Sequence, residues 1–462
     1  MIGLKQVMKN LPEVESPKEK LGFNDKLKWT LIILGAFFIL SNIPLYGLGP
    51  SFLTRFDQLA VLLGTDFGSI ISLGIGPIVT ASIILQLLVG SGIINIDTNK
   101  EEGKKYFQGL QKILVIFFII FESSVFVLMG GLSPDSSLGN IGVTLMIVQL
   151  ILGGIAIMMM DDVVQKWGFG SGISLFIAGG VSLRLFTSLL QFFGTEGIKG
   201  GFQPVGQIWV FITSIMNNNP TGAIAAAATI LVTILIFLIV VWMQSLKIEV
   251  PLSYDRLRGY GIKWPLAFFY TSVIPVILVS ALAANIQLGA GLIQNWLGKP
   301  TILGEINNQG IAVSGFASWI GGVNLLNAFI TKSYTHFMIL QSIGHVIFYI
   351  FFSVLFGFFW VKTSGMDAQS QAKKIMQSGL TIPGFRKDER ILESVLERYI
   401  MPLTIMGGIA IGLLAAISDI VGTLVVGTSF LLVIMIFYQL YQSIAQQHAT
   451  DMHPSLRKFV KS

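Results

Sequence analysis

Long apolar runs separated by short polar segments are the dominant pattern along this chain of 462 residues. A helix needs about 20 largely apolar residues to cross the hydrocarbon core of a membrane. Ten stretches approach or exceed that length: 29–48, 74–91, 113–131, 141–160, 171–192, 222–246, 265–288, 336–360, 401–421 and 423–445. The pattern therefore predicts an all-α integral membrane protein with ten transmembrane helices.

One short segment near the start is amphipathic. Between Leu4 and Leu11 apolar residues recur at helical spacing, with Lys5 and Lys9 on the other side. This favours a basic helix lying on an anionic membrane surface over a disordered basic tail.

The stretch 52–64 is apolar but too short to span, and it carries Arg55 and Asp57. Glycines lie on both sides of it. Irregular backbone at membrane depth is tolerated only where it is buried in protein or lines a cavity. We therefore expect a re-entrant or short buried helix here.

Lysine and arginine are distributed unequally between alternate loops. With the N-terminus inside, the inner loops and tails carry 25 of the 30 basic residues and the outer loops carry 5. Cytoplasmic loops of membrane proteins are enriched in such residues, so both termini are predicted to be cytoplasmic.

The longest polar gap near the middle, 194–221, leaves five predicted helices on each side. Five is odd, so the second half must enter the membrane with opposite polarity, as in an inverted-topology pair. The expected organisation is a cytoplasmic N-terminus (1–28), a first half (29–193), an external hinge loop (194–221), a second half (222–445) and a cytoplasmic tail (446–462).

Composition agrees with this prediction and limits the chemistry. Residues are 53% hydrophobic and 12% charged, against about 25% charged in soluble domains. There is no cysteine, the four histidines form no metal-binding pair, and no glycine-rich phosphate loop is present. We expect no catalytic residues, no metal and no cofactor, and the chain is read as a conduit or carrier.

Polar residues inside the predicted spans are few, and Glu122 is the one ionisable group well within a span. An ion-coupled carrier would normally show several such groups near the midplane, and an intramembrane enzyme would show paired ones. For a single polar residue, a hydrogen bond between helices is the ordinary explanation. The other candidates are Asp161, Asp162, Asp419, Thr80, Gln86, Gln149, Asn285 and His345.

Two pairs of apolar residues follow glycine-rich segments. Ile75 and Val79 lie four residues apart on one helix face, and so do Ile173 and Ile177. Spacing alone leaves them as core or lipid-facing residues.

Two inner loops, 247–264 and 361–400, are rich in lysine and arginine. Ordinary cytoplasmic charge explains most of these residues. The length of the second loop and its arginines also suit a phosphate-rich partner, and both explanations stay open at this point.

Several separated motifs stand out: residues 73–81 (LGIGPIVTA), 168–177 (GFGSGISLFI), and 274–277 with 284–287. In this order they resemble the start of the second helix, the start of the fifth helix and the seventh helix of the SecY family of protein-translocation channels, and the likeness runs nearly the whole chain. Residues 383–388 (PGFRKD) depart from the bacterial pattern and resemble archaeal and eukaryotic members, and the absence of cysteine favours an archaeal source.

The resemblance implies an hourglass channel of two five-helix halves in the cell membrane. Its pore ring would be Ile75, Val79, Ile173, Ile177, Ile277 and Leu432. Its plug, 53–63, would include Leu53, Arg55, Phe56, Asp57, Leu59 and Leu62. Its lateral gate would lie between helices two and three on one side and helices seven and eight on the other. The gate would hold the polar cluster Thr80, Glu122 and Asn285.

The resemblance also implies partners. Arg256, Arg258, Arg386 and Lys387 would dock the ribosome. SecE and the small Sec-beta subunit would complete a heterotrimer, and nascent polypeptides and signal sequences would pass through it. The alternative is a secondary transporter built on an inverted repeat, which would bind a small solute near the midplane.

Overall fold

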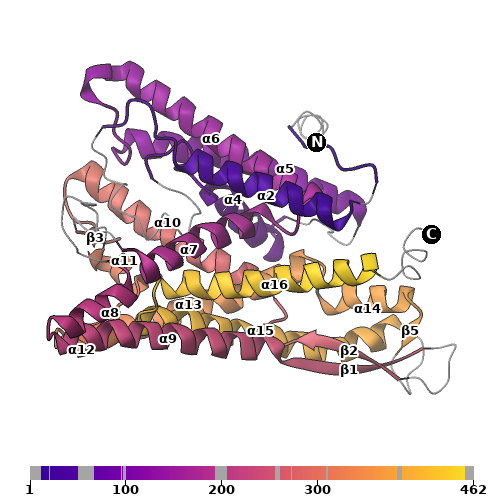
Figure 1. Cartoon of the computed structure of the whole chain (residues 1–462). Helices are drawn as coiled ribbons and strands as arrows, with labels where there is room; N and C mark the ends of the chain where they lie inside the picture. The colour runs from indigo at the N-terminus through magenta and orange to yellow at the C-terminus, as the bar shows by residue number, and fades with distance from the viewer. Residues whose placement is uncertain are drawn as a thin grey trace.

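The computed structural model describes residues 12–19, 21–49, 67–94, 96, 100–192, 205–254, 261–271, 273–307, 311–381 and 388–452. Long helices lie side by side and account for most of these residues (Figure 1). In the first half they are α2 (Phe23–Ser41), α4 (Gly76–Gly90), α5 (Glu101–Leu128), α6 (Gly139–Trp167) and α7 (Gly172–Leu190). In the second half they are α9 (Pro220–Ser245), α10 (Ile274–Leu297), α13 (His336–Thr363), α15 (Glu389–Val421) and α16 (Gly427–Met452).

Each of the ten predicted stretches overlaps one of these helices, and eight of the helices are long and apolar enough to cross a membrane. The two that fall short are α2 and α4. Helix α4 has only 15 residues, and α2 begins with the charged segment 25–28. The described structure therefore has the helices of a multi-pass membrane protein, and a crossing by α2 and α4 stays a prediction.

The helices form two groups that meet along two lines. In the first group α4 contacts α5, α5 contacts α6, and α6 contacts both α2 and α7. In the second group α13 contacts α10 and α15, while α16 contacts α9 and α15. Helix α7 meets α16 on one side, and α4 meets α10 and α13 on the other.

Glycine allows the closest of these approaches. A Cβ atom added to Gly153 on α6 would lie 1.9 Å from the carbonyl oxygen of Ile70, and one added to Gly412 on α15 would lie 2.7 Å from that of Tyr349 on α13. Small residues are common where membrane helices pack backbone to backbone. These glycines therefore belong to the packing of each half.

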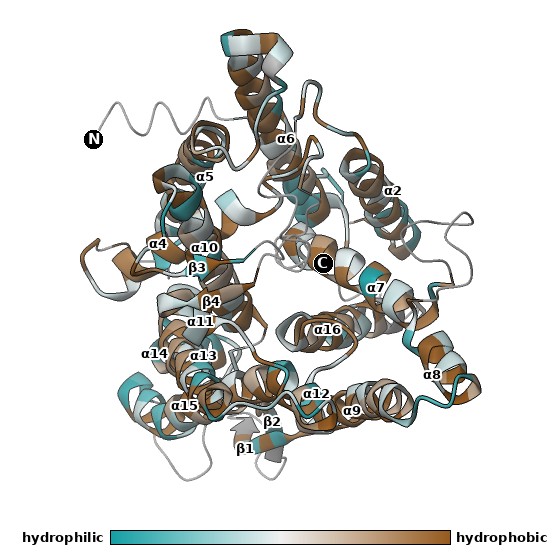
Figure 2. Cartoon of the chain, turned by 90° about the vertical axis from the view of Figure 1, so that its left-hand side faces the viewer, coloured by the Kyte–Doolittle hydropathy of each residue, from teal (hydrophilic) through white to brown (hydrophobic). Residues whose placement is uncertain are grey.

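The outer surface of the long helices also carries apolar side chains. Seen along the helix axes, the brown colour of apolar residues covers much of the ribbon of most helices (Figure 2). Leu31 on α2, Leu238 on α9 and Phe351 on α13 are each more than half exposed. A surface of this kind is stable in lipid and not in water.

One end of the molecule, which we call the sheet end, carries β1 (Lys247–Tyr254), β2 (Gly261–Ala267), β5 (Leu380–Thr381) and α14 (Ala368–Gln377) (Figure 1). The strands form an antiparallel sheet in the order β2-β1-β5, with Lys247 opposite Ala267. This end has its own hydrophobic core. It consists of Val250, Leu252, Leu266, Tyr270, Val361, Ala372, Ile375, Leu392, Leu396, Ile400 and Leu403.

The two basic segments interpreted as loops are therefore largely folded. Helix α15 begins at Glu389, well before the predicted start at residue 401. Its added turns bury Leu392, Leu396 and Ile400 at helical spacing, with polar residues on the other face. An amphipathic extension is apolar on one face only, so it does not belong to the apolar run that predicts a spanning helix.

The opposite end, which we call the loop end, carries β3 (Glu305–Ile306), β4 (Ala312–Ser314), α11 (Gly315–Ile320) and α12 (Leu325–Ile330) (Figure 1). The short η2 (Ser136–Leu138) precedes α6. The side chain of Gln294 on α10 holds this region through both backbone groups of Ile306, at 3.1 and 2.5 Å. The segment between the predicted spans 265–288 and 336–360 thus includes a part that packs against α10.

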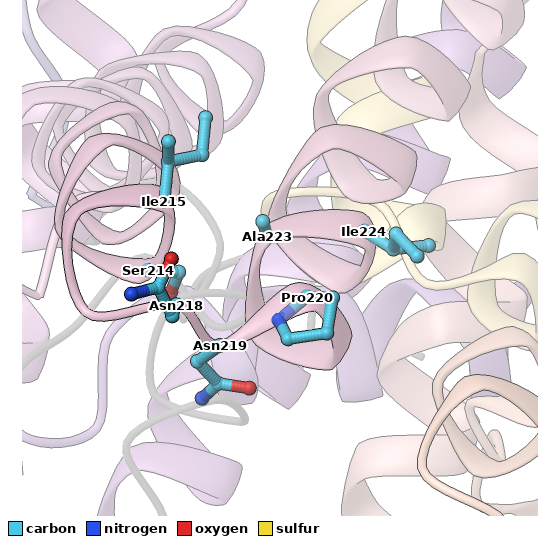
Figure 3. A pocket seen from close by; sticks show the side chains of 7 residues that line it. All are labelled: Ser214, Ile215, Asn218, Asn219, Pro220, Ala223 and Ile224. Atoms are coloured by element: carbon cyan, nitrogen blue, oxygen red, sulfur yellow. The ribbon is translucent and has the colours of Figure 1, made fainter.

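The described part of the predicted hinge loop contains α8 (Gln207–Met216), a short apolar helix packed against α9. A pocket of about 480 Å³ lies at the turn between the two helices (Figure 3). It is lined by Ser214, Ile215, Asn218, Asn219, Pro220, Ala223 and Ile224. All of these belong to α8, α9 or the turn, so the pocket lies apart from the line where α4 meets α10.

Candidate functional site

A hydrogen-bonded cluster joins three helices where the two halves meet. The Thr80 hydroxyl on α4 donates to Glu122 Oε1 on α5 at 3.1 Å and accepts from Asn285 Nδ2 on α10 at 3.0 Å. The same hydroxyl hydrogen is shared with the Gly76 carbonyl at 2.9 Å. The structure thus brings together the three residues of the expected polar cluster, and all three are half-buried.

Other contacts follow the same line, which we call the seam. It runs between α4 and α5 on one side and α10 and α13 on the other, and α4 contacts both α10 and α13. In Figure 2 these four helices form one column. Asn295 Nδ2 on α10 donates to the carbonyl of Met129, just after α5, at 3.0 Å. A Cβ on Gly90, at the end of α4, would lie 2.4 Å from the Phe359 ring on α13. The sequence did not single out Asn295, because its only signal was an asparagine near a helix end.

The six apolar candidates come from four helices and share one hydrophobic cluster. Ile75, at the start of α4, and Val79, within it, are 1% and 2% exposed. On α7, Ile177 is buried and Ile173 is partly buried against the same cluster. Ile277 on α10 and Leu432 on α16 complete the set. These six aliphatic side chains offer no hydrogen bonds to a polar group.

Adjacent carboxylates at the end of α6 contact different helices. Asp162 Oδ2 accepts from Lys112 Nζ on α5 at 2.8 Å. Asp161 Oδ1 instead accepts from the backbone N–H of Ile173 on α7 at 3.1 Å. One residue therefore ties α6 to a seam helix, and the other ties α6 to a helix of the apolar cluster.

The polar candidates on the loop-end side also have partners. Gln149 on α6 makes two hydrogen bonds with the backbone of Tyr46, at 3.0 and 3.2 Å. His345 Nδ1–H donates to the Ile320 carbonyl at 2.6 Å, and its Nε2 lies 3.2 Å from Asp419 Oδ2. Both side chains of that pair are nearly inaccessible. The pair fastens the α11 region to α13 and α15.

Gln86 on α4 differs from these residues. It is 4% exposed, and its Oε1 has no hydrogen-bond partner within the described part of the chain. It lies on a seam helix, but no neighbouring donor ties it to the polar cluster.

A short N-terminal segment is held against the sheet-end side of α6. Lys166 Nζ binds Glu13 Oε1 at 2.5 Å and the Val14 carbonyl at 2.6 Å, while Trp167 Nε1 donates to the Glu15 carbonyl at 2.9 Å. The hydrogen bond from Lys166 lowers the pKa of Glu13 below its ordinary value. This contact did not emerge from the sequence because the partners are far apart along the chain.

Several predicted features lie outside the described residues. These are the amphipathic helix between residues 4 and 11, the plug 53–63, and the basic residues Arg256, Arg258, Arg386 and Lys387. Within the described ranges, no group of three or more His, Cys, Asp or Glu side chains could hold a metal ion.

The sequence matches one family of known proteins. The sequence model of the SecY family matches residues 69–441. The protein translocase subunit SecY of Methanothermobacter thermautotrophicus is 42% identical over 454 residues, which cover 97% of this chain and 96% of that protein.

Two solved structures are similar over almost their whole length. A protein-conducting channel has a TM-score of 0.82 and 37% identity, with 98% of each chain covered. Sec61 in the canine ribosome–channel complex from the endoplasmic reticulum has a TM-score of 0.79 and 37% identity, also with 98% of each chain covered.

Proposed function

This chain belongs to the SecY family and is a protein-conducting channel rather than an enzyme, and from that premise we propose how its residues perform the task. Secretory polypeptides cross through the apolar cluster between the halves, and apolar helices leave sideways through the seam. The single observation that carries this proposal is that α4 and α10 contribute both to the buried apolar candidates and to the hydrogen-bonded seam. An inverted-repeat transporter is set aside by the family assignment.

The apolar cluster supplies the pore ring. Ile75, Val79, Ile173 and Ile177, with Ile277 and Leu432, offer a moving peptide no hydrogen bonds, so they close around it without holding it. When no peptide is present, the same side chains pack on one another and disfavour water and ions. Their burial in one cluster supports this role.

The seam supplies the lateral gate. Thr80, Glu122 and Asn285 hold α4, α5 and α10 together by a few polar contacts of modest strength. An apolar segment that enters between these helices replaces such contacts with apolar packing and continues into lipid. The cost of opening is therefore small compared with the gain from partitioning a spanning helix.

The remaining assignments rest on the resemblance of the motifs. Residues 53–63 form the plug, and SecE and Sec-beta assemble with the chain. Both termini face the cytoplasm, in accord with the distribution of basic residues. The ribosome docks on the sheet end through Arg256, Arg258, Arg386 and Lys387, and Sec61 in its ribosome–channel complex supports this proposal.

Site-specific photo-crosslinking from Ile177 tests the pore. A ribosome-stalled secretory chain is offered to the reconstituted complex, with a probe at Ile347, which is 61% exposed on α13, as the control. We expect crosslinks from Ile177 that shift as the chain is lengthened, and none from Ile347. Stable engagement of the chain without a crosslink from Ile177 would refute the pore axis.

Ribosome docking is tested separately with Arg386→Glu. Phosphate contacts dominate such affinity and depend on salt, so the variant should bind ribosomes more weakly and with a shallower salt dependence. Lys299→Glu, on the proposed outer side, is the control. Equal binding by both variants would exclude docking at Arg386.

A further inference from the structure

Helix α7, which carries two residues of the proposed pore ring, begins without a cap of its own. Its N-cap, Ser171, has extended backbone angles, φ −103° and ψ 137°, but its side chain makes no capping hydrogen bond. The first backbone N–H groups of a helix have no partner within the helix and need an acceptor from elsewhere. Asp161 on α6 provides that acceptor, since its Oδ1 receives the N–H of Ile173 at 3.1 Å.

The surroundings of Asp161 are built for this contact. The residue is 6% exposed, and its second oxygen accepts from Gln165 Nε2 at 2.8 Å, so both oxygens are engaged. A Cβ added to Gly172 would lie 2.7 Å from the Asp161 Cα and 2.8 Å from its Oδ1. Glycine at this position therefore lets the start of α7 reach the carboxylate.

The turn that leads into α7 is held from a second side. The N–H of Phe169 donates to the Thr30 hydroxyl of α2 at 3.0 Å, and Gly170 adopts a left-handed φ of +74°. With the turn fixed by α2 and the first helical turn fixed by α6, the rotation of α7 about its axis is determined. A helix turns by about 100° per residue, so a small slip at its start moves every side chain on the ring-facing side.

We propose that Asp161 is a positioning residue for the pore ring: it caps α7 from the neighbouring helix and fixes the rotation at which Ile173 and Ile177 seal the waist. This inference rests on the proposed function, because it presupposes that Ile173 and Ile177 line the constriction. The negative charge adds to the effect, since a carboxylate at a helix N-terminus is stabilised by the helix dipole.

Asp162 is the matched control within the same chain. It is the next residue on α6 and carries the same charge, but its carboxylate binds Lys112 of α5 at 2.8 Å. Replacing Asp162 by alanine removes one carboxylate from the same helix end and leaves the hydrogen bond to Ile173 in place. A general loss of stability at this end of α6 would follow from either substitution, whereas a leaking waist would follow only from Asp161→Ala.

Ion conductance of the reconstituted, peptide-free channel complex is the measurement, with melting temperature recorded for each variant. Asp161→Ala should raise the leak about fivefold, in line with the loss of a helix cap, and Asp162→Ala should leave it unchanged. Ser171→Asp, added to Asp161→Ala, supplies a cap from within α7 and should return the leak toward the wild-type level. Asp161→Asn conserves volume and one acceptor, so it should leak about twofold even where the alanine variant folds poorly.

The variant Ile177→Gly distinguishes the pore-ring assignment from the positioning role of Asp161. A leak from Ile177→Gly without any leak from Asp161→Ala or Asp161→Asn overturns the positioning role and leaves the ring intact. No leak from any of these variants overturns the ring and the positioning role together. An equal leak from Asp162→Ala, or no rescue by Ser171→Asp, shows that Asp161 acts only through general stability and also overturns the proposal.

Discussion

Thr80 links the two sides of the seam, and Thr80→Val tests how firmly its hydroxyl keeps the gate closed. Valine has nearly the shape of threonine, so the change removes the hydroxyl without opening a cavity. It deletes the bond to Glu122 on α5 and the bond from Asn285 on α10, which measure 3.1 and 3.0 Å. Only the bond from Asn285 crosses the seam. Glu122 lies on α5, on the same side as α4, and the bond to Gly76 lies within α4.

The magnitude follows from the one bond that crosses the seam. A hydrogen bond between membrane helices contributes about 0.6 kcal/mol on average and about 1.7 kcal/mol at most. The loss of the bond from Asn285 should therefore destabilise the closed seam by about 0.6 to 1.7 kcal/mol. A change of that size shifts an equilibrium by a factor of roughly 3 to 20 in favour of the open form.

Distances between two spin labels report this shift directly. The chain has no native cysteine, so the labels attach only to introduced cysteines. Phe117→Cys on α5 and Ile347→Cys on α13 place labels at exposed positions on the two sides of the seam. Thr80→Val should increase the population of long distances roughly three- to twentyfold over the parent. Thr80→Ser keeps the hydroxyl, and Thr229→Val removes a hydroxyl bonded only to its own helix, so both should match the parent. A Thr80→Val distribution equal to these controls would refute the gate reasoning.

Three further predictions concern packing and charge. Gly153→Ala should lower stability by about 3 kcal/mol, whereas Gly180→Ala, which has open space around the added methyl, should change the melting temperature little. Docking of the N-terminal segment should persist above about pH 4.5 and weaken below it, because the folded-state pKa of Glu13 is lowered and the charged carboxylate stabilises docking. Protease sensitivity checks this, and Glu13→Gln should release the segment already at neutral pH. Asp419→Ala leaves Nε2 of the buried His345 without its partner and should cost about 1 to 3 kcal/mol by thermal unfolding; an unchanged melting temperature would contradict the pairing.

The sequence predicted the helices well because the signal for each is local. A run of about 20 apolar residues has few alternatives to a membrane helix, whatever the rest of the chain does. The same reasoning placed the start of α15 about twelve residues too late, since its amphipathic extension becomes apolar on one face only when the sheet-end core forms around it. Strand β1 was missed for the same reason, because its buried Val250 and Leu252 are separated by Pro251 inside a charged segment.

The sequence by itself also determined which residues are chemically unusual: one carboxylate within a span and two adjacent carboxylates near a helix end. It showed no constellation typical of a catalytic site. Only the tertiary structure decided what those residues contact. Asp161 and Asp162 are neighbours with the same side chain, yet one caps α7 and the other pairs with α5. Successive residues on a helix point about 100° apart, so the packing of the surrounding helices assigns each a different partner.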